Sequence, residues 1–458
     1  MTSERTTAIL WFRRDLRLHD HPALLAALEA ADEVLPVFVL DPSLLDTGVP
    51  RSQRLVASLH SLASDTRDAL VVKNGDPVDV IPGLARQVGA TTVHVTRETT
   101  PYGRRRDEAV ASALADDDRE LVATGTPYAV GPGLVVNGSG SPYKVFTPFS
   151  KAWRQHGWPD PAERPARIPW ARPRVASDDL PALPDGVRLE AGEGAARKRW
   201  EEFVTDGLDT YADERNRPDL DTTSRMSAPL KYGEIHPRTM LADIAAHGGG
   251  RSKGATTYVD ELAWREFYAD VLWHHPRSSW HDLRPELAKL PYDSGAETDR
   301  LVDAWREGRT GYPIVDAGMR QLLAEGWMHN RVRMITASFL TKDLHVYWTV
   351  GAQHFLDHLV DGDVASNNHG WQWVAGTGTD ASPYFRVFNP VTQGKKFDPD
   401  GEYVRRWVPE LRHLPGAAAH EPWKAPGGAP AGYPEPIVEH AAERQVALAR
   451  YEQVRAGA

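Results

Sequence analysis

The first 130 residues alternate short apolar runs with stretches of helical periodicity, and this alternation limits the possible folds more than any other feature. The apolar runs are rich in Val and Leu and contain no internal polar alternation. Continuously apolar strands separated by helices are typical of a parallel sheet that is covered on both faces. The expected strands are 8–12, 33–40, 69–73, 92–96 and 120–123, and the expected helices are 22–31, 51–68, 79–88 and 103–115.

These elements predict an α/β N-terminal domain, doubly wound around a parallel sheet. It lacks the glycine fingerprint of dinucleotide binding, so its fold alone assigns no cofactor. Residues 157–190 are rich in Pro, Arg and Asp, which indicates a connection over the surface. From about residue 191 onward, amphipathic windows predict helices. We therefore expect an α/β domain over 1–130, an inter-domain linker over 131–190 and an all-α domain over 191–458.

The composition excludes several classes of site. The chain has no cysteine, which excludes disulfides, cysteine-ligated metals and iron–sulfur clusters. A formal charge of −10 argues against a uniformly basic surface for nucleic acid, but a local basic face stays possible. The sequence contains no run of about 18 apolar residues and no apolar leader, so we expect a cytoplasmic protein. Most of the 15 tryptophans should pack in cores, while a few could stack on ligands or transfer electrons.

A first helical window, 261–268, combines acidic, aromatic and basic side chains on one face. Glu261, Trp264, Arg265 and Tyr268 recur at i, i+3, i+4 and i+7. One interpretation is a solvated salt bridge beside a packing Trp. The other is a pocket wall that stacks on an aromatic ligand.

Two further windows, 326–334 and 361–373, also mix polar and apolar groups. We expect 326–334 to be helical, with Asn330, Arg333 and Met334 on one face. In 361–373 two acids stand two residues apart. They could ligate a metal, but no EF-hand spacing surrounds them, and a plain turn between helices would use the same residues. The two acids are Asp361 and Asp363, for which Arg333 is an organic counter-charge.

The run 222–227 places hydroxyl side chains before an expected helix. Hydroxyls and backbone amides at a helix start can bind a phosphate. Ordinary helix capping would use the same residues.

Taken together, these blocks resemble the photolyase/cryptochrome family. The matching runs, in order between about residues 8 and 451, are 11–20, 264–268, 310–317, 326–334 and 361–373. The similarity is greatest to class I cyclobutane pyrimidine dimer photolyases. It implies a lyase that repairs these dimers in ultraviolet-damaged DNA by electron transfer from excited FADH⁻. The α/β domain would then carry an antenna and the helical domain FAD, in a protein expected to be monomeric.

The resemblance implies an FAD site. Asn367 would face flavin N5, where an amide can accept a hydrogen bond from the reduced ring. The phosphates, the ring and its polar edge would be held by Tyr211, Thr223, Ser224, Arg225, Met226, Ser227, Arg265, Arg333, Asp361 and Asp363.

It also implies a lesion pocket that receives a dimer flipped out of the duplex. Trp264 and Trp373 would be its two indole walls, and Glu261 would hydrogen-bond a pyrimidine edge. Asn330 and Met334 would complete it. Met334 stands where photolyases for (6-4) lesions carry a histidine, which favours cyclobutane dimers. The phosphate contacts would be Arg215, Arg331 and Arg386.

The family reduces oxidised flavin through a wire of aromatic residues. Trp371 and Trp348 match its first two links. The third tryptophan is not evident, and Tyr292 is the candidate for its place. His369 departs from the family, which usually has glycine there.

The expected antenna is 8-hydroxy-5-deazaflavin, because Asp41, Arg54, Glu98 and Lys231 resemble the subgroup that carries it. A folate antenna and an empty site stay open.

The main alternative function is a cryptochrome-type blue-light photoreceptor, and a second is a flavin electron-transfer protein unrelated to DNA. Asn367 favours repair, because an acid at that position would suit the plant-cryptochrome radical state. Two indoles and a carboxylate around one pocket would have no purpose in an electron carrier.

Overall fold

The computed structural model describes residues 5–45, 48–172, 175–184, 189–284, 287, 289–380 and 386–456. By compactness the chain divides into two units. The first comprises the chain up to Asp209 together with Ser224–Pro276, and the second comprises Thr210–Thr223 together with the chain from Arg277 onward. The helices at 224–276 therefore cluster with the sheet. The functional division into 1–130, 131–190 and 191–458 stays a prediction.

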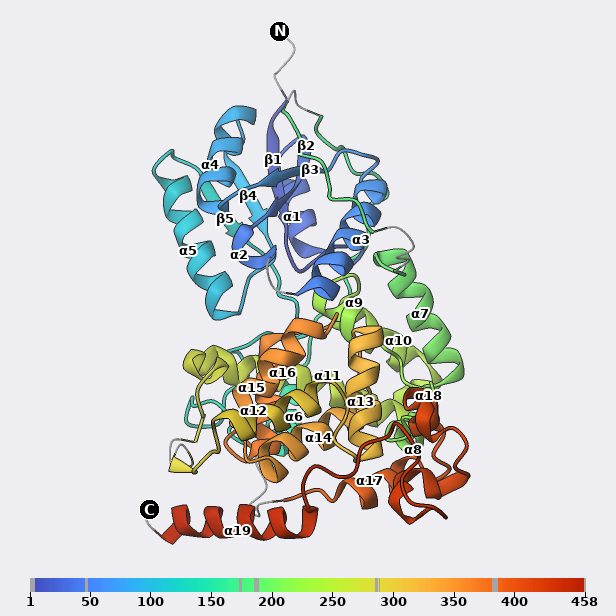
Figure 1. Cartoon of the computed structure of the whole chain (residues 1–458). Helices are drawn as coiled ribbons and strands as arrows, with labels where there is room; N and C mark the ends of the chain where they lie inside the picture. Colours follow the sequence, from blue (N-terminus) through green and yellow to red (C-terminus); the bar gives the residue numbers. More distant parts are fainter. Residues whose placement is uncertain are drawn as a thin grey trace. The chain divides into compact units, whose positions relative to one another are not determined.

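The first unit is built on a five-stranded sheet of order β3-β2-β1-β4-β5, in which every pair of neighbouring strands is parallel (Figure 1). The chain winds outward from β1 to β3, then crosses back to β4 on the other side of β1. The strands are β1 (Thr7–Phe12), β2 (Glu33–Leu40), β3 (Val71–Asn74), β4 (Thr92–Val95) and β5 (Glu120–Ala123).

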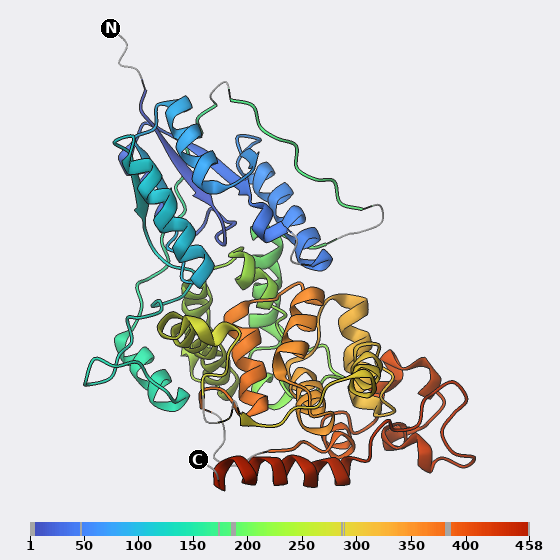
Figure 2. The same cartoon turned by 60° about the vertical axis from the view of Figure 1, so that its left-hand side comes forward.

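Both faces of the sheet are covered. Successive side chains of a strand point to opposite faces, and those of β1 enter two separate cores. Leu10 packs with α1 and α3, whereas Ile9 packs with α4 and α5. The two pairs of helices lie on opposite sides of the sheet (Figure 2). This arrangement confirms the expected doubly wound α/β domain. The helices of this unit are α1 (Pro22–Ala30), α2 (Pro42–Leu45), α3 (Val49–Asp65), α4 (Pro77–Val88), α5 (Pro101–Ala115), α6 (Phe146–His156), α7 (Glu193–Asp206), α9 (Ser227–Tyr232), α10 (Pro237–Ala246), η1 (Gly248–Gly250) and α11 (Lys253–His274).

The segment expected to run over the surface also pairs with the sheet. Val34 of β2 forms a parallel bridge with Trp170, and Ala171, which is fully buried, donates its N–H to the Val34 carbonyl at 2.8 Å. Further along, Asp178 donates its N–H to the carbonyl of Val72 in β3. The segment thus satisfies backbone groups of β2 and β3.

The second unit is helical around one apolar core, which includes Trp305, Trp348 and Phe355. Its helices are α8 (Tyr211–Glu214), η2 (Pro276–Ser279, from Arg277), α12 (Ala296–Arg306), α13 (Pro313–Glu325), α14 (Asn330–Ser338), the π-helix η4 (Phe339–Asp343), α15 (Trp348–His358), α16 (Val364–Ala375), α17 (Pro390–Phe397), α18 (Glu402–Trp407), η5 (Pro409–Leu411), η6 (Gly416–His420), η7 (Pro422–Lys424) and α19 (His440–Ala456). In the part of the chain that the structure covers, no helix is long and apolar enough to cross a membrane.

One expected helix is wrong in part. The window 326–334 is not helical throughout, because α13 ends at Gly326, which takes the left-handed backbone conformation. A new helix, α14, begins only at Asn330, with the His329 ring as its cap.

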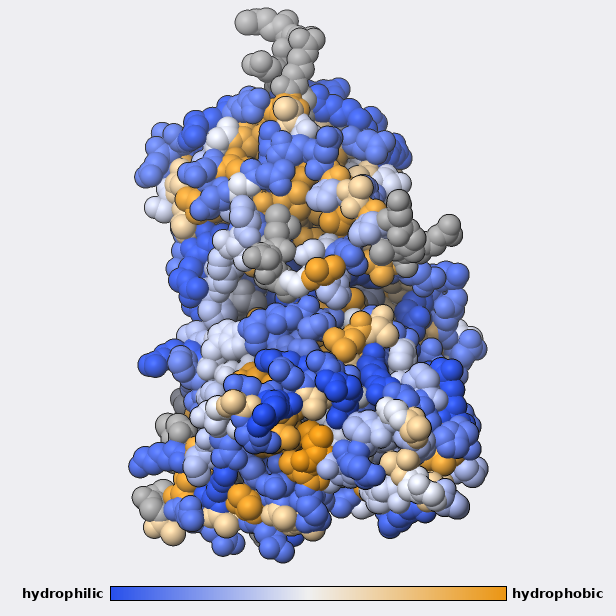
Figure 3. Space-filling model, in the orientation of Figure 1, coloured by the Kyte–Doolittle hydropathy of each residue, from blue (hydrophilic) through white to orange (hydrophobic). Residues whose placement is uncertain are grey.

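Hydrophilic residues predominate on the face that Figure 3 shows, and hydrophobic residues form scattered patches there. Three of the large hydrophobic residues that are clearly exposed lie close together in sequence, ahead of and at the start of α6. They are Leu134, Val136 and Val145.

Candidate functional site

Helix α11 of the first unit carries the expected pocket wall. Ser252 caps its start, and its side chain accepts a hydrogen bond from the Ala255 N–H. Glu261 and Trp264 lie one turn apart and are both half-buried, whereas Leu262 and Ala263 between them are buried. The two expected lesion contacts therefore share the accessible side of the helix.

Phe146, the first residue of α6, stacks on the ring of Trp264. The ring centroids are 3.7 Å apart and the planes differ by 7°. Phe267 meets both rings edge-on, at 5.9 Å from Phe146 and 5.7 Å from Trp264. One face of the Trp264 indole is thus covered by a second aromatic ring. No local pattern in the sequence predicts this partner, which is more than 100 residues away in the chain.

The next two residues of α11, Arg265 and Glu266, form hydrogen bonds with backbone groups of other segments. The Arg265 guanidinium donates to the carbonyls of Pro127 and Leu230 at 3.0 and 3.1 Å and lies over the Tyr128 ring. The buried Glu266 carboxylate accepts N–H groups of residues 129–131. Burial raises the pKa of Glu266 despite these hydrogen bonds. The side chain of Arg265 therefore ties three segments together, and contact with a cofactor stays a prediction for it.

The run 222–227 lies across the boundary of the two units, which falls between Thr223 and Ser224. In the first unit Ser224 is buried, and its Oγ lies 2.8 Å from the Tyr258 hydroxyl. Arg225 has φ of +52°, Met226 is buried, and Ser227 begins α9. In the second unit the buried Thr222 Oγ1 has no hydrogen-bond partner among the described residues.

Arg333 and Asp361 form an ion pair inside the second unit. Nη2 of Arg333 lies 2.9 Å from Oδ2 of Asp361, and its Nε donates to the Met328 carbonyl at 2.8 Å. Asp361 is 6% exposed, and its Oδ1 is buried without a hydrogen-bond partner within the described ranges. A buried carboxylate oxygen of this kind requires a donor. The polar edge of a flavin supplies N–H groups, so the residues present fit the cofactor that the sequence implies.

Asp363 caps the start of α16, where its carboxylate accepts the Ser366 N–H at 3.0 Å. The two acids therefore have different roles, because Asp361 forms an ion pair and Asp363 caps a helix. No group of three or more His, Asp or Glu suited to a metal occurs in the ranges that the structure describes.

Asn367, one turn into α16, has its amide orientation fixed by hydrogen bonds. Its Nδ2 donates to the carbonyl of Ala352 at 3.1 Å and to Oδ1 of Asn368 at 2.8 Å. Asn368 is itself oriented, because its Nδ2 donates to the Ser279 carbonyl. Carbonyl oxygens only accept, so both amides have one possible orientation. The oxygen of Asn367 is left as its available acceptor.

Asn330, Arg333 and Met334 share one side of α14, as expected. Asn330 is exposed and the other two are half-buried, while Val332 and Ile335 on the opposite side are buried. Trp373 of α16 is half-buried as well, and both Trp373 and Met334 pack on the core of this unit.

The three arginines expected to contact phosphates lie in the second unit. The Arg331 guanidinium donates to the side-chain oxygen of Asn216 at 2.7 and 3.1 Å and lies over the Phe397 ring. Burial and the nearby positive charge of Arg215 lower the pKa of Arg331. Arg215 itself lies over the ring of Tyr211 at 5.6 Å. Arg386 is exposed, and its carbonyl accepts a hydrogen bond from Lys342.

Trp371 and Trp348 are both buried in the core of the second unit. A Cβ atom on Gly351 would lie 2.1 Å from the far end of the Trp371 ring, so Trp371 packs on α15 one turn beyond Trp348. Two aromatic neighbours were missed. Trp305 meets Trp371 edge-on at 6.1 Å, and Tyr347 lies between Trp348 and Tyr292, at 5.8 and 5.0 Å from their ring centroids.

His369 is buried and ties α16 to η2. Its Nδ1 lies 2.8 Å from the Ala365 carbonyl, so Nδ1 carries a proton. Its Nε2 lies 2.9 Å from the Ser278 hydroxyl. Gln372, one turn later, donates to the Ser278 carbonyl and accepts the Leu283 N–H. The residue that departs from the family is thus an anchor for the segment after α11.

Two of the four expected antenna residues, Asp41 and Glu98, follow the carboxyl ends of strands, where ligands bind in open α/β sheets, whereas Arg54 lies in α3 and Lys231 in α9. Asp41 follows β2 and accepts hydrogen bonds from the Tyr102 hydroxyl and the Ser43 N–H. Arg54 of α3 is paired with the fully buried Glu234, which also accepts from Ser58.

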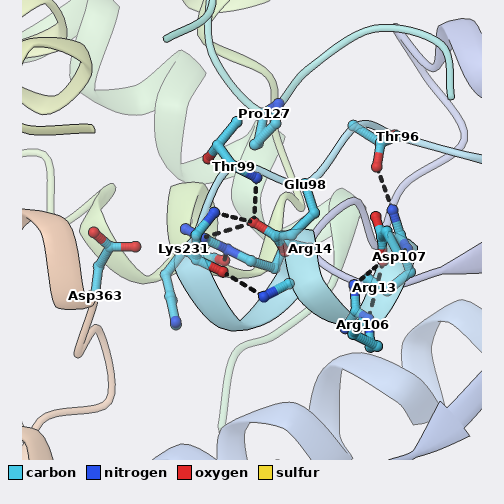
Figure 4. A network of polar contacts seen from close by, with 12 residues as sticks. Arg13, Arg14, Thr96, Glu98, Thr99, Arg106, Asp107, Pro127, Lys231 and Asp363 are labelled. Carbon is cyan, nitrogen blue, oxygen red and sulfur yellow. Dashed lines mark hydrogen bonds and ion pairs between the residues drawn. The ribbon is translucent and has the colours of Figure 1, made fainter. Parts of the chain in front are cut away.

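Glu98 follows β4 and lies in a dense polar network (Figure 4). It accepts the N–H groups of Thr99 and Thr100 and lies 3.9 Å from Arg14, whose Nε donates to the Lys231 carbonyl. Burial alone would raise the pKa of Glu98, but Arg14 and two further arginines outweigh it and lower the pKa. Position 103 must be glycine here, because a Cβ atom would lie 1.8 Å from Glu98 Cγ.

A family model described as DNA photolyase matches residues 8–167, and one described as the FAD binding domain of DNA photolyase matches residues 258–453. A deoxyribodipyrimidine photo-lyase of Streptomyces griseus is 42% identical over 98% of this chain and 99% of its own length. The photo-lyase of Escherichia coli is 39% identical over 99% of this chain and 100% of its own.

Solved structures agree. A bacterial class III photolyase from Agrobacterium tumefaciens has a TM-score of 0.92 at 37% identity and 99% coverage of both chains. A Synechocystis cryptochrome has a TM-score of 0.89 at 28% identity, covering 99% of this chain and 100% of its own. The relatives match along their whole length, the FAD-binding domain is shared, and the fold is common to all. The chain therefore belongs to the photolyase/cryptochrome family.

Proposed function

We propose that this protein is a light-driven DNA repair lyase that splits cyclobutane pyrimidine dimers, and that it belongs to class I. The coarser part, a photo-lyase that acts in DNA repair, rests on the full-length photo-lyase relatives, which are 36–42% identical. The finer part rests on the residues. The observation that carries it is the amide of Asn367, held with its oxygen available as an acceptor.

An acceptor at this place suits a flavin whose N5 carries hydrogen, which is the reduced ring. The bound FAD, when reduced, supplies the light-driven electron that breaks the two bonds between the pyrimidines and takes it back afterwards. No external oxidant or reductant is consumed, so the reaction is that of a lyase.

The chain's own residues bind and orient the cofactor. Asp361 would accept from the polar edge of the ring through Oδ1, which has no hydrogen-bond partner among the described residues, while Arg333 holds the carboxylate in place. Hydroxyls of Thr223, Ser224 and Ser227, with Tyr211, would hold the phosphates. These groups need no proton transfer. Their role is placement, which accounts for much of the catalysis when reacting groups must be close.

On the substrate side, Trp264 would stack on the dimer with the face that Phe146 leaves open. From the family resemblance, Trp373, Asn330 and Met334 would contact the dimer as well, and Glu261 would hydrogen-bond a pyrimidine edge and stabilise the dimer anion. Arg215, Arg331 and Arg386 would bind phosphates of the strand. A dimer is cheaper to flip out than paired bases, which gives selectivity for damage. We propose that one copy of the chain suffices.

The test is repair of a dimer-containing oligonucleotide by purified, chemically reduced protein under blue light, with a dark control. Light-dependent loss of dimers is expected. Bound flavin without any repair would instead favour the cryptochrome-type photoreceptor, which the structural likeness to the Synechocystis protein keeps as second candidate. An oligonucleotide with a (6-4) lesion is the matched substrate control, and we expect no repair of it, because Met334 replaces the histidine.

For the antenna we propose 8-hydroxy-5-deazaflavin, with a folate as the alternative. The polar network at the carboxyl ends of β2 and β4 supports a ligand there, although Arg54 is already paired with Glu234. A structural relative from Sulfolobus tokodaii was solved with two FAD molecules. Extraction of the purified protein followed by mass spectrometry identifies the antenna directly.

A further inference from the structure

The aromatic chain in the second unit continues past Trp348 to a shared carboxylate. Asp282 Oδ1 accepts a hydrogen bond from Trp348 Nε1 at 2.7 Å and another from the Tyr347 hydroxyl at 3.0 Å. The other oxygen, Oδ2, is buried and has no hydrogen-bond partner among the residues described. One carboxylate therefore touches the polar atoms of two adjacent oxidisable rings.

This arrangement suits electron loss from those rings. A negative charge at 2.7 Å stabilises the positive charge that Trp348 carries after it gives up an electron. A phenol is oxidised readily only when its proton can leave at the same time, and Tyr347 points its hydroxyl at a carboxylate. Burial and Asp282 raise the pKa of Tyr347 to about 12, so the resting ring keeps its proton.

We propose that Tyr347 is the electron donor to oxidised Trp348 and that Asp282 accepts the phenolic proton. This proposal rests on the proposed flavin function, which supplies the oxidant, a light-excited oxidised flavin. Trp348 loses one electron to it through Trp371. Tyr347 then gives one electron to Trp348, the Tyr347 O–H bond breaks, and the proton moves to Asp282. Trp348 is restored, Tyr347 is a neutral radical and Asp282 a carboxylic acid.

The step also removes the positive charge from the aromatic rings. After it, no positive charge remains on the rings to attract the transferred electron back. The ring of Tyr292 lies 5.0 Å from that of Tyr347, and among the described residues no hydrogen bond or ring contact joins Tyr292 to Trp348. Tyr347, the residue directly before Trp348, thus takes the role for which Tyr292 was the candidate.

The experiment is laser-flash spectroscopy with electron paramagnetic resonance on oxidised, flavin-loaded protein. The wild type should form a tyrosyl radical after a tryptophan radical. In Tyr347→Phe the tryptophan radical should persist and no tyrosyl radical should form. Asp282→Asn keeps the hydrogen-bond acceptor but removes the base, and should slow tyrosyl formation about 100-fold. Asp282→Glu should restore most of the rate.

A tyrosyl radical that survives in Tyr347→Phe and is lost in Tyr292→Phe would overturn the proposal. An unchanged rate in Asp282→Asn would overturn the proton transfer. Repair by wild-type protein reduced with dithionite bypasses the wire and tests the proposed function separately. If light does not reduce the flavin in the wild type, the proposed electron transfer from Tyr347 through Trp348 is refuted. This holds even if the dithionite-reduced protein repairs dimers.

Discussion

Asn368 sets the orientation of Asn367. Its Oδ1 accepts from Asn367 Nδ2 at 2.8 Å, and its own Nδ2 is held by the Ser279 carbonyl. Asn368 is fully buried, so no water competes for these groups. If the Asn367 amide were reversed, its oxygen would face two other acceptors, the Ala352 carbonyl and Asn368 Oδ1. The hydrogen bonds therefore hold the amide in one orientation.

From this relationship we predict that Asn367→Asp stabilises the one-electron-reduced, protonated flavin. A carboxylic acid in this position can donate a proton toward N5, which the amide oxygen cannot. Absorption spectra after illumination measure the change. Asn367→Leu is the control, since it removes the acceptor without adding an acid. A spectrum of Asn367→Asp that matches wild type would contradict the assignment of Asn367 to N5.

Phe146→Leu should weaken binding to dimer-containing DNA. The stacked pair fixes the plane of Trp264, and such aromatic pairs contribute about 0.5–1.5 kcal/mol, which corresponds to about 2- to 12-fold in Kd. Phe146→Tyr keeps the ring and should bind as wild type. Binding to dimer and undamaged oligonucleotides is compared at equal salt. If Phe146→Leu binds the dimer more tightly, Phe146 occupies the lesion's place rather than supporting it.

Glu261→Ala should lower the repair yield while flavin content stays near that of wild type. Glu261 lies on the same side of α11 as Trp264. The variant loses one hydrogen bond to a charged intermediate, and a loss of about 1.4 kcal/mol in that hydrogen bond lowers the rate about tenfold. Glu261→Gln keeps hydrogen bonding but not the acidic proton, so the two variants separate those roles. An unchanged quantum yield in Glu261→Ala would refute the role of this carboxylate.

The sequence predicted most of the fold, because its signals are local. All five expected strands occur, with ends shifted by at most two residues, since buried parallel strands are continuously apolar. The error at 326–334 is also local, because Gly326 takes a left-handed conformation that ends a helix. The residues that were missed act through tertiary contacts. Asp282 meets Trp348 across 66 positions, and nothing in the sequence marks such a pair.

Prediction of site residues from the family resemblance is limited in a similar way. The motifs predict Asn367, Arg333 and Asp361 as site residues, but they do not predict the partners that fix them, such as Asn368. A family motif records which side chains meet the ligand. The support behind them depends on each chain's own packing, as His369 shows by its contact with Ser278.

Lys342 should make stability depend on pH. It is 4% exposed in η4, and burial lowers its pKa from 10.5 to about 7. Below about pH 7 both folded and unfolded states carry the proton. Between about pH 7 and 10.5 the folded state releases the Lys342 proton, while the unfolded state keeps it. The unfolded state therefore binds more protons in this range, and the free energy of unfolding rises with pH. The slope is at most about 1.4 kcal/mol per pH unit.

Lys342→Met should remove this rise and stabilise the protein at neutral pH, because no charge is then buried. Chemical unfolding midpoints measured from pH 6 to 10 check it. The matched control is Lys396→Met, in which an exposed lysine of the same unit is replaced and the slope should stay. Stability that is flat with pH in the wild type would mean that Lys342 keeps its proton in the folded state, with the Arg386 carbonyl as sufficient partner for the charge.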